Sequence, residues 1–199
     1  MLPLAPEFLA RHPDVALDIV LTDEVVDLLE QRTDVAVRAG PLKNSTLVAR
    51  KLGETRMVIV GAPTYLARHG IPLTPGALDQ HNLLGANYVR AQRGWPLREG
   101  NVDTTAPITG NAQASNGEAL RGLAIARLGL ARLAAFQVRE DIAAGRLVAV
   151  LEDFNPGDME EIHAVFLGQG GYLPLRVRAF LDFLAERVRF DLPVLSGFP

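Results

Sequence analysis

Strand-like and helix-like stretches alternate along nearly the whole chain, and this alternation limits the fold more than any other feature. The alternating residues Val15 to Leu21 predict a strand, and Thr22 and Asp23 follow as residues that favour helix N-termini before a helical pattern from Val25. Other helices are predicted at 2–11, 63–68, 116–127, 136–144 and 175–189, and other strands at 34–38, 46–52, 55–60, 130–133, 147–151 and 162–167. Such alternation predicts an α/β fold.

The composition excludes several classes of protein. A length of 199 residues allows one large domain or two small lobes, and 48% hydrophobic with 22% charged residues is typical of a globular chain. No apolar run approaches the roughly 18 residues of a membrane span, and no secretory signal is present, so neither a membrane partner nor export is expected. The lack of cysteine fits a cytoplasmic location, and scattered basic residues with a net charge of −3 predict no DNA-binding face.

The sequence offers little for catalysis. None of the three serines, Ser45, Ser115 and Ser196, lies in a Gly-x-Ser-x-Gly motif, and no phosphate-binding glycine loop is present. The four histidines lack metal-ligand spacing, so no metal or other cofactor is expected. An enzyme that used the carboxylate of Asp23 would need a second catalytic group, and the sequence provides no convincing one. A non-enzymatic binding protein is therefore the favoured class.

Several blocks of sequence carry a resemblance to a known family. They are PEFLARHPDV at 6–15, DVAVRAG at 34–40, APTYLARHG at 62–70, SNGEAL at 115–120, AGRLV at 144–148 and VRAFLDFL at 177–184. In order and spacing they resemble the C-terminal effector-binding domain of LysR-type transcriptional regulators, over nearly the whole chain.

The resemblance implies two Rossmann-like lobes joined by two crossover strands, like the type II periplasmic-binding-protein fold, with a small-molecule cleft between them. Lobe I would be residues 1–61 plus 166–190, lobe II residues 62–165, and residues 191–199 a C-terminal tail. The family's N-terminal winged helix-turn-helix and the first strand of lobe I are absent from this sequence, which suggests a fragment or a truncated reading frame. The candidates to fill the missing strand position are the tail and a neighbouring chain.

The strongest local motif in lobe II is the start of the helix at Ser115. Ser115 as N-cap with Glu118 at N3 predicts a capping box, and a helix N-terminus also suits a carboxylate ligand. In the family this turn faces the cleft, which favours a binding role for Asn116 in addition to capping. Arg132 is predicted either at a sheet edge or pointing toward the cleft, with the edge favoured. Arg127 stands where many family members have glycine, so a left-handed conformation there would cost about 1 kcal/mol.

Lobe I contributes the helix start at Thr22 and Asp23, for which a plain N-cap is the alternative. Arg38 and Gly40 close a strand, and ligands collect at the carboxyl ends of strands in open α/β sheets, although an ion pair within the lobe would also explain Arg38. The predicted ligand-binding residues are Thr22, Asp23, Arg38, Gly40, Ala62, Ser115, Asn116 and Arg132.

The expected function is that of a regulatory sensor domain. It would bind a small organic effector, with a carboxylate as the expected group, and transmit lobe closure through a homo-oligomer, a dimer or tetramer, to an attached DNA-binding domain. The alternative is a solute-binding component of a transporter, which shares the fold but would need export.

Overall fold

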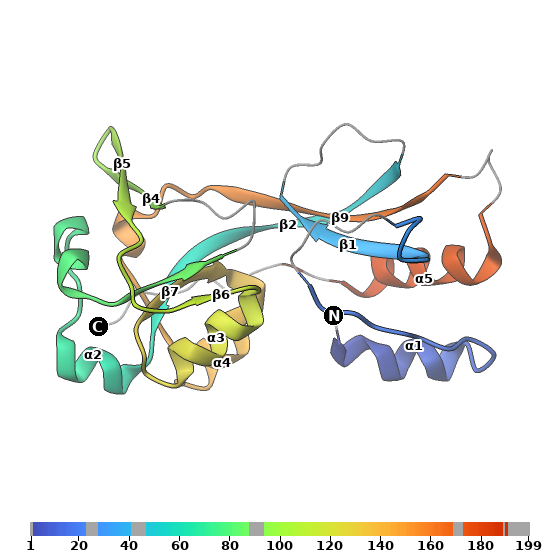
Figure 1. Ribbon diagram of the computed structural model, residues 1–199, viewed down its shortest axis with the longest axis horizontal. Helices are drawn as coiled ribbons and strands as arrows, with labels where there is room; N and C mark the ends of the chain where they lie inside the picture. Colours follow the sequence, from blue (N-terminus) through green and yellow to red (C-terminus); the bar gives the residue numbers. More distant parts are fainter. Residues whose placement is uncertain are drawn as a thin grey trace. The chain divides into compact units, whose positions relative to one another are not determined.

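The computed structural model describes residues 2–22, 28–40, 47–87, 94–168, 173–188 and 190. The chain divides into two compact units (Figure 1). Unit 1 contains Met1–Leu21, Val25–Glu54 and Glu160–Phe190, and unit 2 contains Thr22–Glu24, Thr55–Met159 and Asp191–Pro199. Two strands, β2 (Leu47–Gly61) and β9 (Met159–Leu167), have residues in both units. These unit boundaries fall a few residues before the lobe boundaries expected from the resemblance, and the lobe assignment stays a prediction.

Unit 1 is a small sheet with helices. Its hydrogen-bonded strand order is β1-β9-β2, with β1 (Val35–Ala39) antiparallel to β9, and α5 (Leu175–Arg187) packs on the sheet. The packed core joins Ala164, Val177 and Leu181 to the partly buried Val35, Leu52, Phe166 and Leu173. The N-terminal η1 (Leu2–Leu4) and α1 (Ala5–Arg11) complete the unit. The Phe8 ring of α1 contacts the rings of Phe180 and Phe183 on α5, at 5.0 and 5.2 Å between centroids.

Unit 2 is built on a mixed sheet with the strand order β2-β7-β3-β6, and β8 (Val148–Val150) also pairs with β2. The strands β3 (Leu83–Ala86), β6 (Gln113–Ala114) and β7 (Leu130–Ala134) are parallel, whereas β2 runs antiparallel to β7 and β8. Its helical segments are α2 (Pro63–His69), η2 (Pro75–Gln80), α3 (Gly117–Ile125), α4 (Ala135–Ala143) and η3 (Glu152–Phe154).

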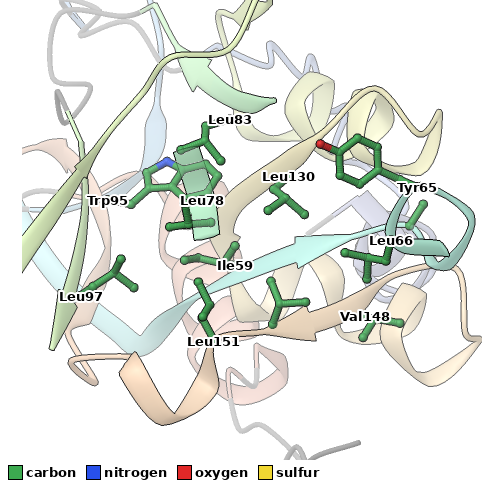
Figure 2. Close-up of a cluster of buried hydrophobic side chains, with 12 residues drawn as sticks. Ile59, Tyr65, Leu66, Leu78, Leu83, Trp95, Leu97, Leu130, Val148 and Leu151 are labelled. Carbon is green, nitrogen blue, oxygen red and sulfur yellow. The ribbon is translucent and has the colours of Figure 1, made fainter. Parts of the chain in front are cut away.

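Alternate residues of β2 and β7 supply two cores in unit 2, because successive side chains of a strand point to opposite faces. Ile59 and Leu130 belong to a cluster with residues of α2, η2 and β8 (Figure 2). Val58, Val60, Ala131 and Leu133 belong to a second cluster with the apolar faces of α3 and α4. The central strands are therefore apolar on both faces, as expected for an α/β sheet covered on both sides.

The element types predicted from periodicity are confirmed for most of the described chain, with two corrections. The strand predicted at Val15 to Leu21 is wrong: residues 15–22 have no strand structure, and Ile19, Val20 and Leu21 are 48%, 74% and 63% exposed. Alternation alone is insufficient, since a strand needs a hydrogen-bonded neighbour, and this segment has none among the described residues.

The two strands predicted around Gly53 are also wrong, because β2 is a single strand of 15 residues. Gly53 lies within the strand, and the ring of Phe190 lies where a Cβ at this position would stand, 2.4 Å from it. The glycine is thus explained by a close side-chain approach rather than by a chain break.

Several elements were not predicted, among them the strands β3 and β6 and the antiparallel hairpin of β4 (Gly94–Glu99) and β5 (Val102–Pro107). Trp95, the single tryptophan, and Leu97 of β4 are buried in the cluster of Figure 2. Among the described residues, β1 pairs with β9 on one side and has no second strand partner. The tail at 191–199 lies outside the described residues, so the idea that it completes lobe I stays a prediction.

Candidate functional site

The predicted residues of unit 1 that the structure describes lie at the carboxyl end of β1. Arg38 is the penultimate residue of β1 and stands directly opposite His163 of β9. Gly40 follows the strand with a φ of 85°, and its N–H donates to the Glu161 carbonyl at 3.0 Å. A left-handed backbone of this kind favours glycine. Thr22 is exposed and outside any helix or strand, and Asp23, with its predicted helix start, lies outside the described residues.

Charged side chains surround this strand end. The Lys51 ammonium bonds the carboxylates of Glu161 and Glu54 at 2.8 and 2.9 Å, and Lys51 holds the pKa of Glu161 below its ordinary value. The Nε2 atom of His163 lies 3.6 Å from Glu161, while its buried Nδ1 atom has no hydrogen-bond partner within the described chain. Sequence reasoning missed His163, because only the register of β1 against β9 brings it beside Arg38.

In unit 2, Asn116 begins α3. Its backbone is extended, and its side-chain Oδ1 accepts the N–H of Ala119 at 2.8 Å, so Asn116 is the N-cap. The predicted capping box is therefore wrong: Ser115 lies one residue outside the cap, and the Glu118 carboxylate pairs with Arg121 instead. Asparagine caps helices as well as serine does, so the helix can begin one residue later at no cost.

Ala62 and Ser115 differ in what they can offer a ligand. Ser115 is exposed, so its hydroxyl is accessible. The Ala62 side chain is 3% exposed and belongs to the apolar cluster of Figure 2. Its carbonyl already accepts the N–H groups of Tyr65 and Leu66 at the start of α2.

Arg132 is not at a sheet edge, so that expectation is corrected. Its strand β7 lies between β2 and β3, and Arg132 stands opposite Ile59 of β2. The side chain is only 6% exposed and donates to the carboxylate of Asp158 at 2.5 Å. Burial of a guanidinium in a central strand is tolerated because this carboxylate neutralises it. Sequence reasoning missed Asp158, which is 26 residues away in the chain.

The strand register relates Asn116 and Arg132 to the same part of the unit 2 sheet. The pairings of Leu84 with Ala131 and of Ala86 with Ala114 place Arg132 about level with Gly85 and Gln113, and Asn116 follows Gln113 by three residues. The two residues belong to different faces, however. Arg132 stands opposite Ile59, on the face of the cluster with Ile59 and Leu130, whereas α3 packs on the other face with Val58 and Val60. The N–H groups at the start of α3 and the guanidinium of Arg132 each favour a negative charge.

A second charged cluster of unit 2 is structural. The Asp141 carboxylate is fully buried and accepts hydrogen bonds from the guanidinium groups of Arg121 and Arg146. Burial raises the pKa of Asp141, but the two arginines outweigh this effect and hold it below the ordinary value. The cluster ties α3 to α4 and to the residues after α4.

The described residues contain no group of three or more His, Asp or Glu side chains arranged to hold a metal ion. Within the same part of the chain, no helix combines the length and the apolar character needed to cross a membrane.

Comparison with known proteins gives a consistent result. Residues 1–189 match the family described as the LysR substrate binding domain. The HTH-type transcriptional regulator CrgA of Neisseria meningitidis serogroup C (strain 8013) is 35% identical over 192 residues, which cover 96% of this chain and 63% of CrgA. An HTH-type transcriptional regulator of Xanthomonas campestris pv. campestris (strain 8004) is 34% identical over 193 residues, 95% of this chain and 56% of the regulator.

Solved structures show the same similarity. The structure of CrgA from Neisseria meningitidis has a TM-score of 0.85 at 34% identity, covering 93% of this chain and 62% of CrgA. The structure of the CrgA regulatory domain has a TM-score of 0.82 at 33% identity, covering 93% of this chain and 90% of that domain. The chain thus spans less than two thirds of the whole regulators but most of their regulatory domain.

Proposed function

Since the chain belongs to the LysR substrate binding domain family, we propose that it is the effector-sensing part of a DNA-binding transcriptional regulator. The match over residues 1–189 carries this proposal, and the relatives supporting it are named as HTH-type transcriptional regulators. The alternative of a transporter's solute-binding component is not favoured, because these relatives are regulators.

The proposed effector is a small organic molecule with a carboxylate. Two separate features of unit 2 support this chemistry: the N-terminus of α3 at Asn116 and the buried guanidinium of Arg132. Backbone N–H groups at a helix N-terminus and a guanidinium both favour a negative charge. In unit 1, Arg38 adds a second guanidinium. The proposed ligand-binding residues remain Thr22, Asp23, Arg38, Gly40, Ala62, Ser115, Asn116 and Arg132.

The output of the sensor is also part of the proposal. Effector binding would change the geometry of a homo-oligomer, a dimer or tetramer, in the cytoplasm, and a winged helix-turn-helix domain would contact the DNA. A ligand can shift such an equilibrium only through different affinities for its two states.

The test is a thermal-shift screen of the chain against aromatic and aliphatic carboxylic acids, with the matching neutral amides as controls. A carboxylate effector raises the melting temperature, and its amide does not, because the amide lacks the charge that the guanidinium groups and helix N-terminus favour. Each hit is then incubated with the protein and recovered. Recovery of unchanged acid supports a sensor, consumption of the acid supports an enzyme, and a screen without any acid-specific shift contradicts the proposal.

A further inference from the structure

The ion pair of Arg132 and Asp158 is unequal in its exposure to water. The Arg132 side chain is 6% exposed, whereas the Asp158 side chain is 36% exposed. A buried guanidinium needs a counter-charge at all times, but a half-exposed carboxylate can turn into water at little cost. Asp158 is therefore the replaceable member of the pair.

In the other ion pairs of unit 2 that the structure describes, no arginine is as buried as Arg132. Arg56 is 24% exposed, as is Arg121 beside the exposed Glu118, and Arg121 also keeps the carboxylate of Asp141. In the Arg121 and Asp141 pair the carboxylate is the buried member, at 0% exposure, so it cannot leave for water. In the Arg56 and Glu152 pair the two side chains are 24% and 25% exposed, so water reaches both. Only a pair with a buried cation and an accessible anion can accept an external carboxylate in exchange for its own.

Asp158 belongs to a short segment that this ion pair connects to β7. Asn155 is fixed, because its side-chain amide donates to the Met57 carbonyl at 2.8 Å and its Oδ1 accepts the Gly157 N–H at 3.0 Å. Met159, the first residue of β9, is exposed. Between these two points, Asp158 contributes the ion pair to Arg132. The segment leads directly into β9, a strand with residues in both units.

We propose that the carboxylate of the effector replaces Asp158 as the counter-ion of Arg132, so that binding releases the segment at 156–158 that leads into β9. The exchange conserves charge at the guanidinium, since one carboxylate leaves as another arrives. Asp158 then acts as an intramolecular competitor that sets the affinity for the effector. This inference rests on the proposed function, because it assumes that a carboxylate effector reaches Arg132.

The test uses acetate as the probe, so it does not depend on the identity of the effector. In the Asp158→Ala variant, Arg132 is buried without its carboxylate and the melting temperature falls. Sodium acetate should raise the melting temperature of this variant more than sodium chloride at the same concentration does, whereas the wild type should show a much smaller difference. The matched control is Glu152→Ala, which removes the carboxylate from Arg56, a side chain that water already reaches.

The Asp158→Asn variant tests the same step with a more conservative substitution, which removes the charge and keeps the size of the side chain. If the Asp158 carboxylate is paired with Arg132 in about 90% of the molecules, loss of this carboxylate lowers the acetate concentration that half-saturates Arg132 about tenfold. NMR of the Arg132 Nε–H signal reports this directly. In the wild type, high acetate should shift the same signal together with the amide signals of Gly157 and Asp158.

Two results would overturn the inference. One is an acetate effect on Asp158→Ala no larger than that on Glu152→Ala. Another is an Arg132 signal in Asp158→Asn that responds to acetate only as it does in the wild type. Either result would leave the acid screen, and with it the proposed function, unaffected.

Discussion

The N–H of Leu128 donates to the Leu123 carbonyl at 3.1 Å, and this bond closes α3 around a residue with left-handed backbone. The residue is Arg127, with a φ of 69°. Its own N–H donates to the Ala124 carbonyl at 3.0 Å, so the two bonds form a Schellman motif, in which glycine is the usual residue at this position. The conformation suggested for Arg127 by its place in the sequence is therefore confirmed.

The first prediction concerns this position. Arg127→Gly should stabilise the protein by about 1 kcal/mol, because glycine adopts the left-handed conformation without steric cost. The side chain is exposed, so little packing is lost. Urea denaturation measures the change. Arg127→Ala is the control, since it removes the guanidinium but keeps the Cβ, and an equal gain in both variants would show that charge rather than backbone strain is responsible.

The second prediction separates capping from binding at Asn116. Asn116→Ala should lower stability by about 1 kcal/mol, because the N–H of Ala119 loses its acceptor. Asn116→Asp keeps a good cap, so its melting temperature should stay close to that of the wild type, yet its negative charge should weaken binding of any acid found in the screen. Calorimetric titration measures the affinity. Unchanged affinity in both variants would remove Asn116 from the binding site.

The third prediction concerns pH and the buried His81. Burial, and then the nearby His69, hold the pKa of His81 below its ordinary value of 6.5. The folded protein therefore binds fewer protons at His81 than the unfolded chain does, and stability is lost as the pH falls below about 6.5. Denaturant midpoints measured across this range should fall less steeply for His81→Gln. Parallel curves for the two proteins would exclude His81 as the cause.

The hydrogen-bond neighbour of His81 indicates which replacement suits this site. The Tyr65 hydroxyl accepts the N–H of Asn82 at 3.0 Å and also lies 3.3 Å from the Nδ1 atom of His81. Glutamine retains a side-chain carbonyl as acceptor, which makes it the appropriate replacement.

The fourth prediction concerns Asp141. Asp141→Asn should destabilise the protein by about 3 kcal/mol, because it removes the charge that balances two guanidinium groups in a buried pair. The pKa of Asp141 is lowered in the folded state, so its contribution is present at neutral pH and is lost as the pH falls through the folded value. Urea denaturation at neutral and acid pH checks both statements. Asp103→Asn, in an exposed pair with Arg98, should leave stability unchanged at either pH.

The elements predicted best from the sequence are those that their own residues determine. The helices α3, α4 and α5 carry apolar residues at helical spacing, and Gly145, with a φ of 68°, follows the end of α4. The α/β class and the family follow from such local patterns and their order. The strand predicted wrongly at 15–21 is the opposite case: the segment has strand periodicity, but among the described residues it has no neighbouring strand to pair with.

The candidate site shows the same contrast between features set by neighbouring residues and features set by distant ones. The position of α3 could be predicted from residue type, but the predicted N-cap, Ser115, is one residue too early, because asparagine at the next position caps a helix equally well. The environment of Arg132 could not be predicted, because Asp158 reaches it from a distant segment and the strand order makes β7 internal. Long-range pairing of this kind has no signal in a single sequence.

The unbroken course of β2 has a consequence for how this family can vary in length. Leu52 packs in the core of unit 1, and Val58 and Val60 pack in a core of unit 2, all on one uninterrupted strand. Because successive side chains of a strand point to opposite faces, an insertion of one residue between Leu52 and Val58 would exchange the cores into which Val58 and Ile59 point, whereas an insertion of two would not. Natural length changes in this stretch should therefore come in even numbers.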